Sequence, residues 1–272
     1  MSINLTPPTR ITLQSKGTTV SRNINTLNLD ASFGVSNPSV GVGYVDQVGT
    51  VGSFNGHYLI NINDFVYGST GAASGDLYGF QLTSAGGQAS YFQGTDGTYL
   101  GRALLDTKNS TAANPTIDSF AGTNLVQVGS WPWSSEWRVR VETLSTATDR
   151  FVIRVGTSDT TAATPGRPTN GIQFEYTDNV NGGQWTAVTT SASTSTVVNS
   201  TVPVVANTWY RLRADVNAAG TQITFIIDDV ILGTASTNIS LSPTRLKGHI
   251  QKTAGNNSRT LSIDYVGWIS VR

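Results

Sequence analysis

The second half of this chain alternates apolar and polar residues, and this alternation constrains the fold more than any other feature. Trp137, Val139 and Val141 are separated by charged residues. The same pattern recurs in Phe151 to Val155, Ile172 to Tyr176, Tyr210 to Val216, Ile223 to Ile227 and Leu261 to Tyr265. A period of two puts alternate side chains on opposite sides of a β-strand, and turn residues recur here roughly every 8–12 positions. The pattern predicts an antiparallel β-sandwich, or jelly roll, with its apolar side inward.

The composition also favours an all-β fold. Glutamate, a good helix former, occurs only at Glu136, Glu142 and Glu175, while serine, threonine, asparagine and glycine are abundant. Threonine suits strands, whereas asparagine and glycine suit the turns between them. With 272 residues the chain is long enough to bury its own core, so neither a disulfide nor a metal is needed for stability.

Two regions differ in how many large apolar side chains they hold. Residues 1–50 hold few, although Ile11 with Leu13 and Leu27 with Leu29 indicate two short strands. Such a segment cannot form a core alone, so its backbone and apolar groups must be satisfied elsewhere. We therefore predict a small N-terminal β or arm region for attachment and oligomerisation at residues 1–50. A sandwich domain is predicted at residues 51–272.

The charge distribution excludes several partners. Charged residues make up 12% of the chain, the formal net charge is zero, and the basic residues are scattered. Nucleic-acid binding proteins carry a basic patch or stripe, so we expect no nucleic acid.

No apolar stretch approaches the roughly 18 residues that span a bilayer, and the N-terminus lacks the parts of a signal peptide. We expect a protein that is made in a cytoplasm and does not insert into a membrane.

One strand pair carries a family resemblance. The segment 207–215, Asn-Thr-Trp-Tyr-Arg-Leu-Arg-Ala-Asp, leads through the turn at Gly220 into 223–229, Ile-Thr-Phe-Ile-Ile-Asp-Asp. It resembles the concanavalin-like (laminin-G-like) jelly rolls of phage tail and structural proteins, where a "WY-x-L" strand leads into an "F-x-I-D-G" hairpin. Asp229 stands where glycine is usual, which costs some energy in a left-handed turn. Segments 137–155 and 261–266 also match, so the resemblance covers about residues 130–272.

The N-terminal region is similar to a short element of phage fibre and baseplate-associated proteins. There an alternating strand, here residues 10–18, meets an acidic turn, and an apolar "L-N" strand follows, here residues 26–29. Ser15 and Lys16 depart from the acidic pair. Together the resemblances imply a virion protein, namely a tail fibre, a head fibre or a capsid-decoration protein, bound to other virion proteins. Because fibre-like phage proteins are commonly three-fold, they also imply a homotrimer.

Concanavalin-like folds also host polysaccharide-degrading enzymes, so carboxylates must be examined. Retaining glycosidases need two carboxylates about 5–5.5 Å apart, but Glu136 and Glu142 lie at the two ends of one predicted strand. Asp228 and Asp229 are adjacent, which favours turn residues over a calcium site because no acid-rich loop accompanies them. We predict no catalytic residues and no enzymatic activity.

The two histidines give no metal or cofactor site. His57 and His249 are far apart and no cysteine exists, so the usual zinc spacings are absent. Gly248 to Lys252 superficially resembles the "Q-I-H" strand of certain lyases, in reversed order, and we interpret His249 as an ordinary strand residue. The sequence predicts neither a metal nor a cofactor.

The tryptophans give the best functional lead. Trp131 and Trp133 flank a proline in a predicted loop, and Trp185 follows the turn at Asn181 to Gly183. Exposed indoles can stack on sugar rings, so these three are candidate glycan contacts; the alternative is that they fill the core or a subunit interface. Trp209 and Trp268 are predicted to lie opposite the apolar side and are candidate interface residues.

These observations predict a non-enzymatic virion structural protein, displayed on the particle as a fibre or receptor-binding component that contacts host surface glycans. A capsid-decoration or cement protein is the alternative. A polysaccharide-degrading enzyme is disfavoured by the missing carboxylate pair. The predicted location is the virion, after synthesis in the host cytoplasm.

Overall fold

A computed structural model describes residues 80–83, 101–119, 124, 126–160, 166–177 and 181–270 with their side chains. Elsewhere it describes only the backbone of strands. The contacts of the chain divide it into two compact units, Met1–Gly52 and Ser53–Arg272. Strands of the first unit form three pairs: β1 (Ser2–Asn4) with β4 (Thr26–Asn28), β2 (Leu13–Ser15) with β3 (Thr18–Ser21), and β5 (Val35–Ser36) with β6 (Tyr44–Val45). Strands β2 and β4 overlap the two predicted short strands, whereas the attachment role stays a prediction.

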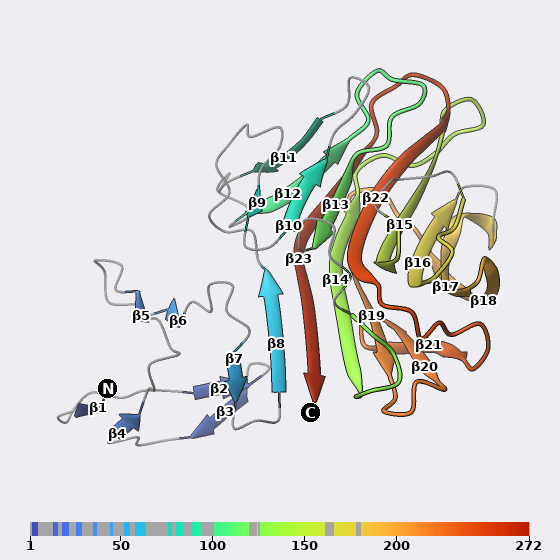
Figure 1. Cartoon of the computed structure of the whole chain (residues 1–272). Coiled ribbons are helices and arrows are strands. Elements are labelled where there is room, and N and C mark those ends of the chain that lie inside the picture. The colour runs from blue at the N-terminus through green and yellow to red at the C-terminus, as the bar shows by residue number, and fades with distance from the viewer. Residues whose placement is uncertain are drawn as a thin grey trace. The chain divides into compact units, whose positions relative to one another are not determined.

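The second unit consists of two antiparallel sheets, drawn as arrows in Figure 1. The eight-stranded sheet has the order β18 (Thr194–Pro203), β17 (Gln184–Ser191), β16 (Gly171–Thr177), β15 (Arg150–Ser158), β22 (Arg245–Ala254), β13 (Thr116–Ser119), β10 (Phe80–Thr83) and β9 (Asp76–Leu77). The nine-stranded sheet has the order β11 (Ala89–Gln93), β12 (Arg102–Asp106), β23 (Thr260–Val271), β14 (Trp133–Val141), β19 (Trp209–Val216), β20 (Ile223–Ile227) and β21 (Val230–Ala235), with β8 (Tyr58–Asn63) also on β23 and β7 (Gly52–Phe54) on β8. One short 3-10 turn, η2 (Asn181–Gly183), precedes β17.

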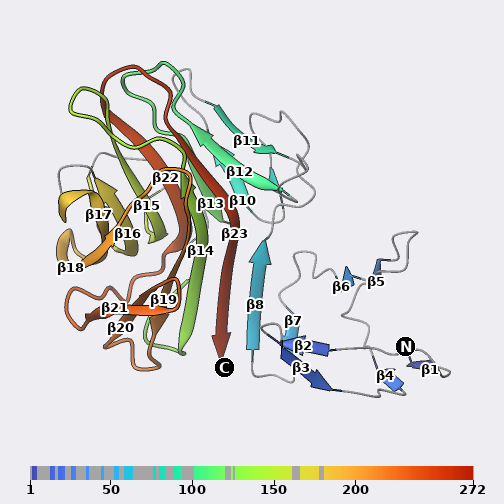
Figure 2. The ribbon, with the colours of Figure 1, turned by 180° about the vertical axis from the view of Figure 1, so that it is seen from behind.

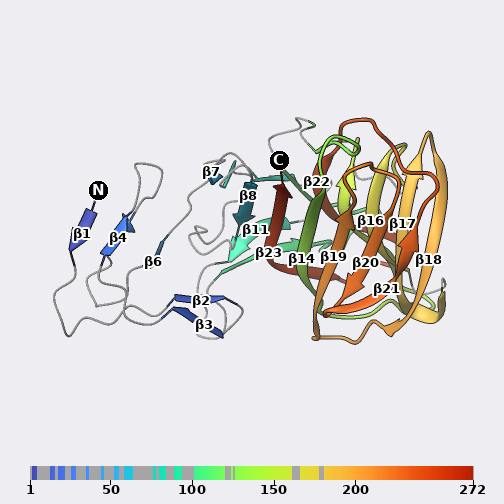
Figure 3. The same ribbon diagram turned by 90° about the horizontal axis from the view of Figure 1, so that it is seen from below.

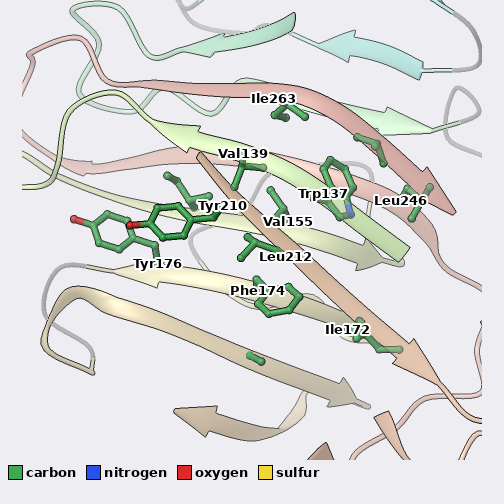
Figure 4. Close-up of a cluster of buried hydrophobic side chains, with 14 of the residues drawn as sticks. Trp137, Val139, Val155, Ile172, Phe174, Tyr176, Tyr210, Leu212, Leu246 and Ile263 are labelled. Atoms are coloured by element: carbon green, nitrogen blue, oxygen red, sulfur yellow. The ribbon is translucent and has the colours of Figure 1, made fainter. Parts of the chain in front are cut away.

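The core lies between the two sheets, which are seen as separate layers in Figure 3. Figure 4 shows side chains of both sheets meeting there, among them Trp137 from one sheet and Phe174 from the other. Phe174 and Phe225 pack edge to face, with ring centres 5.5 Å apart. The predicted all-β antiparallel sandwich is therefore confirmed.

Alternation is clearest in β14, where every second residue from Trp133 to Val141 is buried and those between are half-buried. Strands near the middle of the eight-stranded sheet differ, because their residues are buried on both sides. In β22 the eight residues from Arg245 to Lys252 are all buried, and in β16 the first six are. This sheet therefore has a second buried surface, which faces away from the core.

Tight turns fix the strand pairs of the nine-stranded sheet. Between β19 and β20, the Asn217 side chain accepts hydrogen bonds from the N–H groups of Thr221 and Gln222, at 2.8 and 3.1 Å. Between β20 and β21, Asp228 and Asp229 both have left-handed backbones, with φ of 49° and 68°. The hairpin thus forms with aspartate in place of glycine, and Asp228 stabilises it by accepting the Arg211 N–H at 2.8 Å.

Candidate functional site

The structure places the three candidate glycan tryptophans in different environments. Trp131 is 48% exposed, whereas Trp133 is 3% and Trp185 is 0% exposed. The Trp185 ring packs edge-on against Tyr176 and Tyr210, with centres 6.2 and 5.8 Å away. Neither Trp133 nor Trp185 has a ring face free to stack on a sugar, so the prediction is wrong for both. Trp131 stays a candidate.

The two candidate interface tryptophans also differ. Trp209 is half-buried on the outward side of the nine-stranded sheet, where the guanidinium carbons of Arg138 and Arg140 lie 5.2 and 5.0 Å from its ring centre. Trp268 instead packs against the core. The register between β14 and β23 shifts at Arg138 and Val139, and such a bulge changes the side to which later residues point. The prediction that Trp268 lies opposite the apolar side is therefore wrong, and with it the reason to place Trp268 at an interface.

A row of polar residues crosses the second buried surface of the eight-stranded sheet, which we call the polar row. Strands β13, β22, β15, β16 and β17 lie side by side there (Figure 2). Cross-strand partners along the row are Thr116, His249, Arg154, Glu175 and Thr186. Neighbouring positions carry Asp118, Lys247, Gln173 and Gln251, and all nine residues are buried. The chain thus places its polar side chains together where water is excluded.

Glu175 lies at the centre of an ion-pair network in this row. Its carboxylate accepts hydrogen bonds from Arg154 Nε at 2.7 Å and from Arg167 Nη2 at 3.0 Å. Burial alone would raise the pKa of Glu175, but the hydrogen bonds of Arg167 and the charge of Arg154 outweigh burial and lower that pKa. The side chain is therefore a carboxylate at neutral pH, committed to two arginines.

His249 is wholly buried and neutral. Burial, followed by the charges of Arg154 and Lys247, holds the pKa of His249 well below its usual value. Neither ring nitrogen has a hydrogen-bond partner, and the same is true of Gln173 Nε2 and Gln251 Oε1. A buried polar group left without a partner costs about 1–3 kcal/mol. These three side chains thus present unused donors and acceptors within one surface.

Lys247 adds a second cationic group next to His249. Its amine donates to the carbonyl of Thr160 at 2.8 Å and lies 3.9 Å from Asp118 Oδ1. Burial lowers the pKa of Lys247 to about 8, although the charge of Asp118 opposes this. Burial likewise raises the pKa of Asp118. The row therefore combines neutral hydrogen-bonding groups with flanking cations, an arrangement that can bind hydroxyl-rich ligands.

The glutamates are placed differently from a hydrolase pair. Glu136, on β14, accepts the Tyr265 hydroxyl, and Glu142, the residue after β14, pairs with Arg140, while Glu175 belongs to the other sheet. Within the residues that the structure describes, no group of three or more histidine, aspartate or glutamate side chains could hold a metal ion. Among the same residues, no helix is long and apolar enough to cross a membrane.

Of the polar row, the sequence analysis singled out only His249 for its chemistry, and it interpreted His249 as an ordinary strand residue. A signal was present, because Gln173 with Glu175 and Lys247 with His249 occupy the polar positions of otherwise apolar strands. In a chain with 12% charged residues, long polar side chains on central strands are informative.

Two antiparallel sheets packed over one core define the class: this is a lectin-like, concanavalin-like sandwich fold. Residues 104–264 match the family described as SO2946-like, C-terminal domain, and the chain belongs to this family. The crystal structure of a protein of unknown function, SO2946 from Shewanella oneidensis MR-1, is similar with a TM-score of 0.54 at 14% identity, over 82% of this chain and 89% of that one.

Two further solved structures share the fold. A mutant of the Emp46p carbohydrate recognition domain has a TM-score of 0.50 at 11% identity, over 76% of this chain and 97% of that one. A sialidase has a TM-score of 0.51 at 10% identity, over 77% of this chain but 18% of the sialidase. A comparison with curated proteins finds no match. This chain therefore shares its jelly-roll fold with a carbohydrate recognition domain, and the likeness concerns the fold alone.

Proposed function

We propose that this protein is a non-enzymatic glycan-binding sandwich and that the polar row is its binding surface. The observation that carries this is the set of unpartnered groups on His249, Gln173 and Gln251. Other buried side chains of the described residues also have such atoms, but these three lie together on one surface, and His249 lacks a partner at both ring nitrogens. Unpartnered buried groups call for an explanation. Sugar hydroxyls both donate and accept hydrogen bonds, so they are suited to a neutral imidazole beside two amides. The likeness to the Emp46p carbohydrate recognition domain supports the proposal through the fold.

In this proposal a glycan reaches the polar row from the edge where Arg167 lies. Arg167 has 28% of its side chain exposed and donates to Glu175, which is 5% exposed. In this proposal a bound sugar displaces Arg167 from Glu175 and takes over its hydrogen bonds. Catalysis is not part of the proposal. A general acid needs a raised pKa, whereas the two arginines lower the pKa of Glu175. Asp118, the other carboxylate of the row, has a raised pKa, but it accepts a hydrogen bond from Thr116 and lies 3.9 Å from the amine of Lys247.

The virion role is the second part of the proposal, and the resemblances of residues 10–29 and about 130–272 support it. Residues 1–50 would attach the chain to other virion proteins, and the sandwich would be displayed as a tail fibre, with capsid decoration as the alternative. The chain would be made in the host cytoplasm and leave with the particle. Trp209 is the candidate contact between sandwiches.

The trimer is tested by measuring the mass of the full chain in solution. Closed cyclic symmetry is the usual form of soluble homo-oligomers, and we expect three copies. A Trp209→Ala change should lower the share of trimer, whereas Thr224→Val, another outward position of the same sheet, should not. A monomer at every concentration tested would contradict the oligomer.

The binding site is tested on a glycan array with the full chain. His249→Leu should abolish binding while the melting temperature is retained or rises, because leucine removes two unpartnered nitrogens from a buried position. Thr224→Val is the matched polar-to-apolar control and should bind like the original chain. Trp131→Ala tests whether the exposed indole of Trp131, and not the polar row, binds the glycan. Binding that survives His249→Leu but is lost with Trp131→Ala would move the site to the tryptophan.

A further inference from the structure

A buried charged cluster lies outside the polar row, where the β14–β15 connection meets the β22–β23 connection, which links the two sheets. Its members are Asp149, Lys252 and Arg259, whose side chains are 2%, 0% and 9% exposed. Lys252 lies two positions after Ile250, on the core side of β22, and its cross-strand partner is the core residue Phe151. An amine and a carboxylate are therefore enclosed in contact with each other at the end of the core.

The two oxygens of Asp149 have different partners. Oδ2 accepts the Asn257 N–H at 3.0 Å and lies 3.3 Å from Arg259 Nη2. Oδ1 lies against the amine of Lys252, which also donates to the Asn257 carbonyl at 3.0 Å. One oxygen thus accepts a hydrogen bond and forms an ion pair, and the other faces a nucleophile.

Gly255 allows this close approach. Its backbone has φ of +76°, and a Cβ at this position would lie 2.7 Å from both the Cα and the Cγ of Asp149. No other residue fits without moving the carboxyl group. The β22–β23 connection therefore packs directly on Asp149 and fixes it beside Lys252.

We propose that Lys252 and Asp149 form an intramolecular isopeptide bond. Lys252 Nζ attacks Asp149 Cγ, a C–N bond forms, and the bond from Cγ to Oδ1 breaks. The ammonium and carboxylate together lose two protons and Oδ1 as one water molecule, and Oδ2 becomes the amide oxygen. No oxidant, reductant or second substrate is required, and the charge of Arg259 is unchanged.

The surroundings supply what this reaction needs. Reactants held in contact reach effective molarities of about 10⁵–10⁸ M, which favours condensation in a site without water. The hydrogen bond from the Asn257 N–H and the charge of Arg259 both act on Oδ2, the oxygen on which negative charge develops. Burial, and then the charge of Arg259, lowers the pKa of Lys252, which increases the share of neutral, nucleophilic amine.

The intact mass of the full chain under denaturing conditions tests the bond. We expect a mass one water molecule below the sequence mass, and fragmentation should give a branched peptide that joins the segments around Asp149 and Lys252. Lys252→Arg should restore the full mass. Asp149→Asn should lose ammonia in place of water and reach the same final mass as the cross-linked original chain.

Two results would overturn the proposal. The original chain at its full sequence mass would show that the cluster is an ion pair only. A loss of water that persists in Lys252→Arg, with no branched peptide, would show a cyclic imide at the aspartate. Gly255→Ala keeps both reacting groups and should reduce cross-linking, whereas Gly182→Ala, at a glycine with open space around it, should not.

Discussion

Glu175→Leu is expected to lower the free energy of unfolding by about 3–5 kcal/mol, the range seen when one partner of a buried ion pair is removed. Glu175 and Arg154 have side chains that are 5% and 6% exposed. The change leaves Arg154 and Arg167 beside each other without the carboxylate that both contact, in a region from which water is excluded. Denaturant unfolding with linear extrapolation measures the loss.

The double variant Arg154→Met with Glu175→Leu is the matched control. Replacing both members of a buried pair by apolar residues of similar size is often neutral or stabilising, so most of the lost stability should return. Arg167 can then turn to solvent, since it is already partly exposed. A single variant that loses less than about 1 kcal/mol, the level of an exposed ion pair, would show that the polar row is open to water.

The same pair depends on pH in a defined direction. Because the pKa of Glu175 is lowered in the folded state from its ordinary 4.5, its contribution to stability is present above that value. The contribution is lost as pH falls through the lower folded pKa.

Much of the fold could be predicted because period-two alternation is a local signal. Trp137 to Val141, Ile172 to Tyr176 and Tyr210 to Val216 lie in strands, and their apolar members are in the core. The turn at Asn217 and the hairpin at Asp228 were also readable, because turn chemistry depends on neighbouring residues.

Features that depend on register were not predictable in this way. The bulge between β14 and β23 brings Val266 and Trp268 to the core side, and Tyr265 to the outward side beside Arg138. Strict alternation predicts the opposite, because the sequence alone does not locate the extra residue. Trp185 was misread for a related reason. The Asn181 to Gly183 turn is partly exposed, but β17 begins directly after it and points its second residue into the core.

The polar row shows why a site can be missed when its strands are found. Arg154, Glu175 and His249 each occupy a polar position of a recognisable strand, yet they become neighbours only through the strand order β22, β15, β16. Sequence predicts that these strands exist but not which of them pair. Three unremarkable polar positions therefore become one buried surface only in the folded chain.

Stability is expected to rise by about 2 kcal/mol between pH 8 and pH 10 because of Lys247. Its pKa is about 8 in the folded protein and 10.5 in the unfolded chain. Between these values the unfolded chain binds more protons, so unfolding becomes less favourable as pH rises, by about 1.4 kcal/mol per unit. Below pH 8 both states are protonated, and the penalty for burying the ammonium is constant.

Lys247→Met is the control for this pH dependence. The quantity to compare is the change in unfolding free energy between pH 8 and pH 10, not the absolute stability, because the variant also removes the amine that lies beside Asp118. The variant should remove most of the rise. Lys252 has a lowered pKa, so its amine contributes in the same direction when it is not cross-linked. Any pH dependence that remains in Lys247→Met should therefore vanish when Lys252→Arg is added. In a cross-linked chain this remainder should already be absent. Tyr210 and Tyr265 have raised pKa values and act oppositely near pH 10 and above, which sets the upper limit of the window. An unfolding free energy that stays flat from pH 8 to 10 would place Lys247 in contact with water and remove the closed surface on which the glycan site is built.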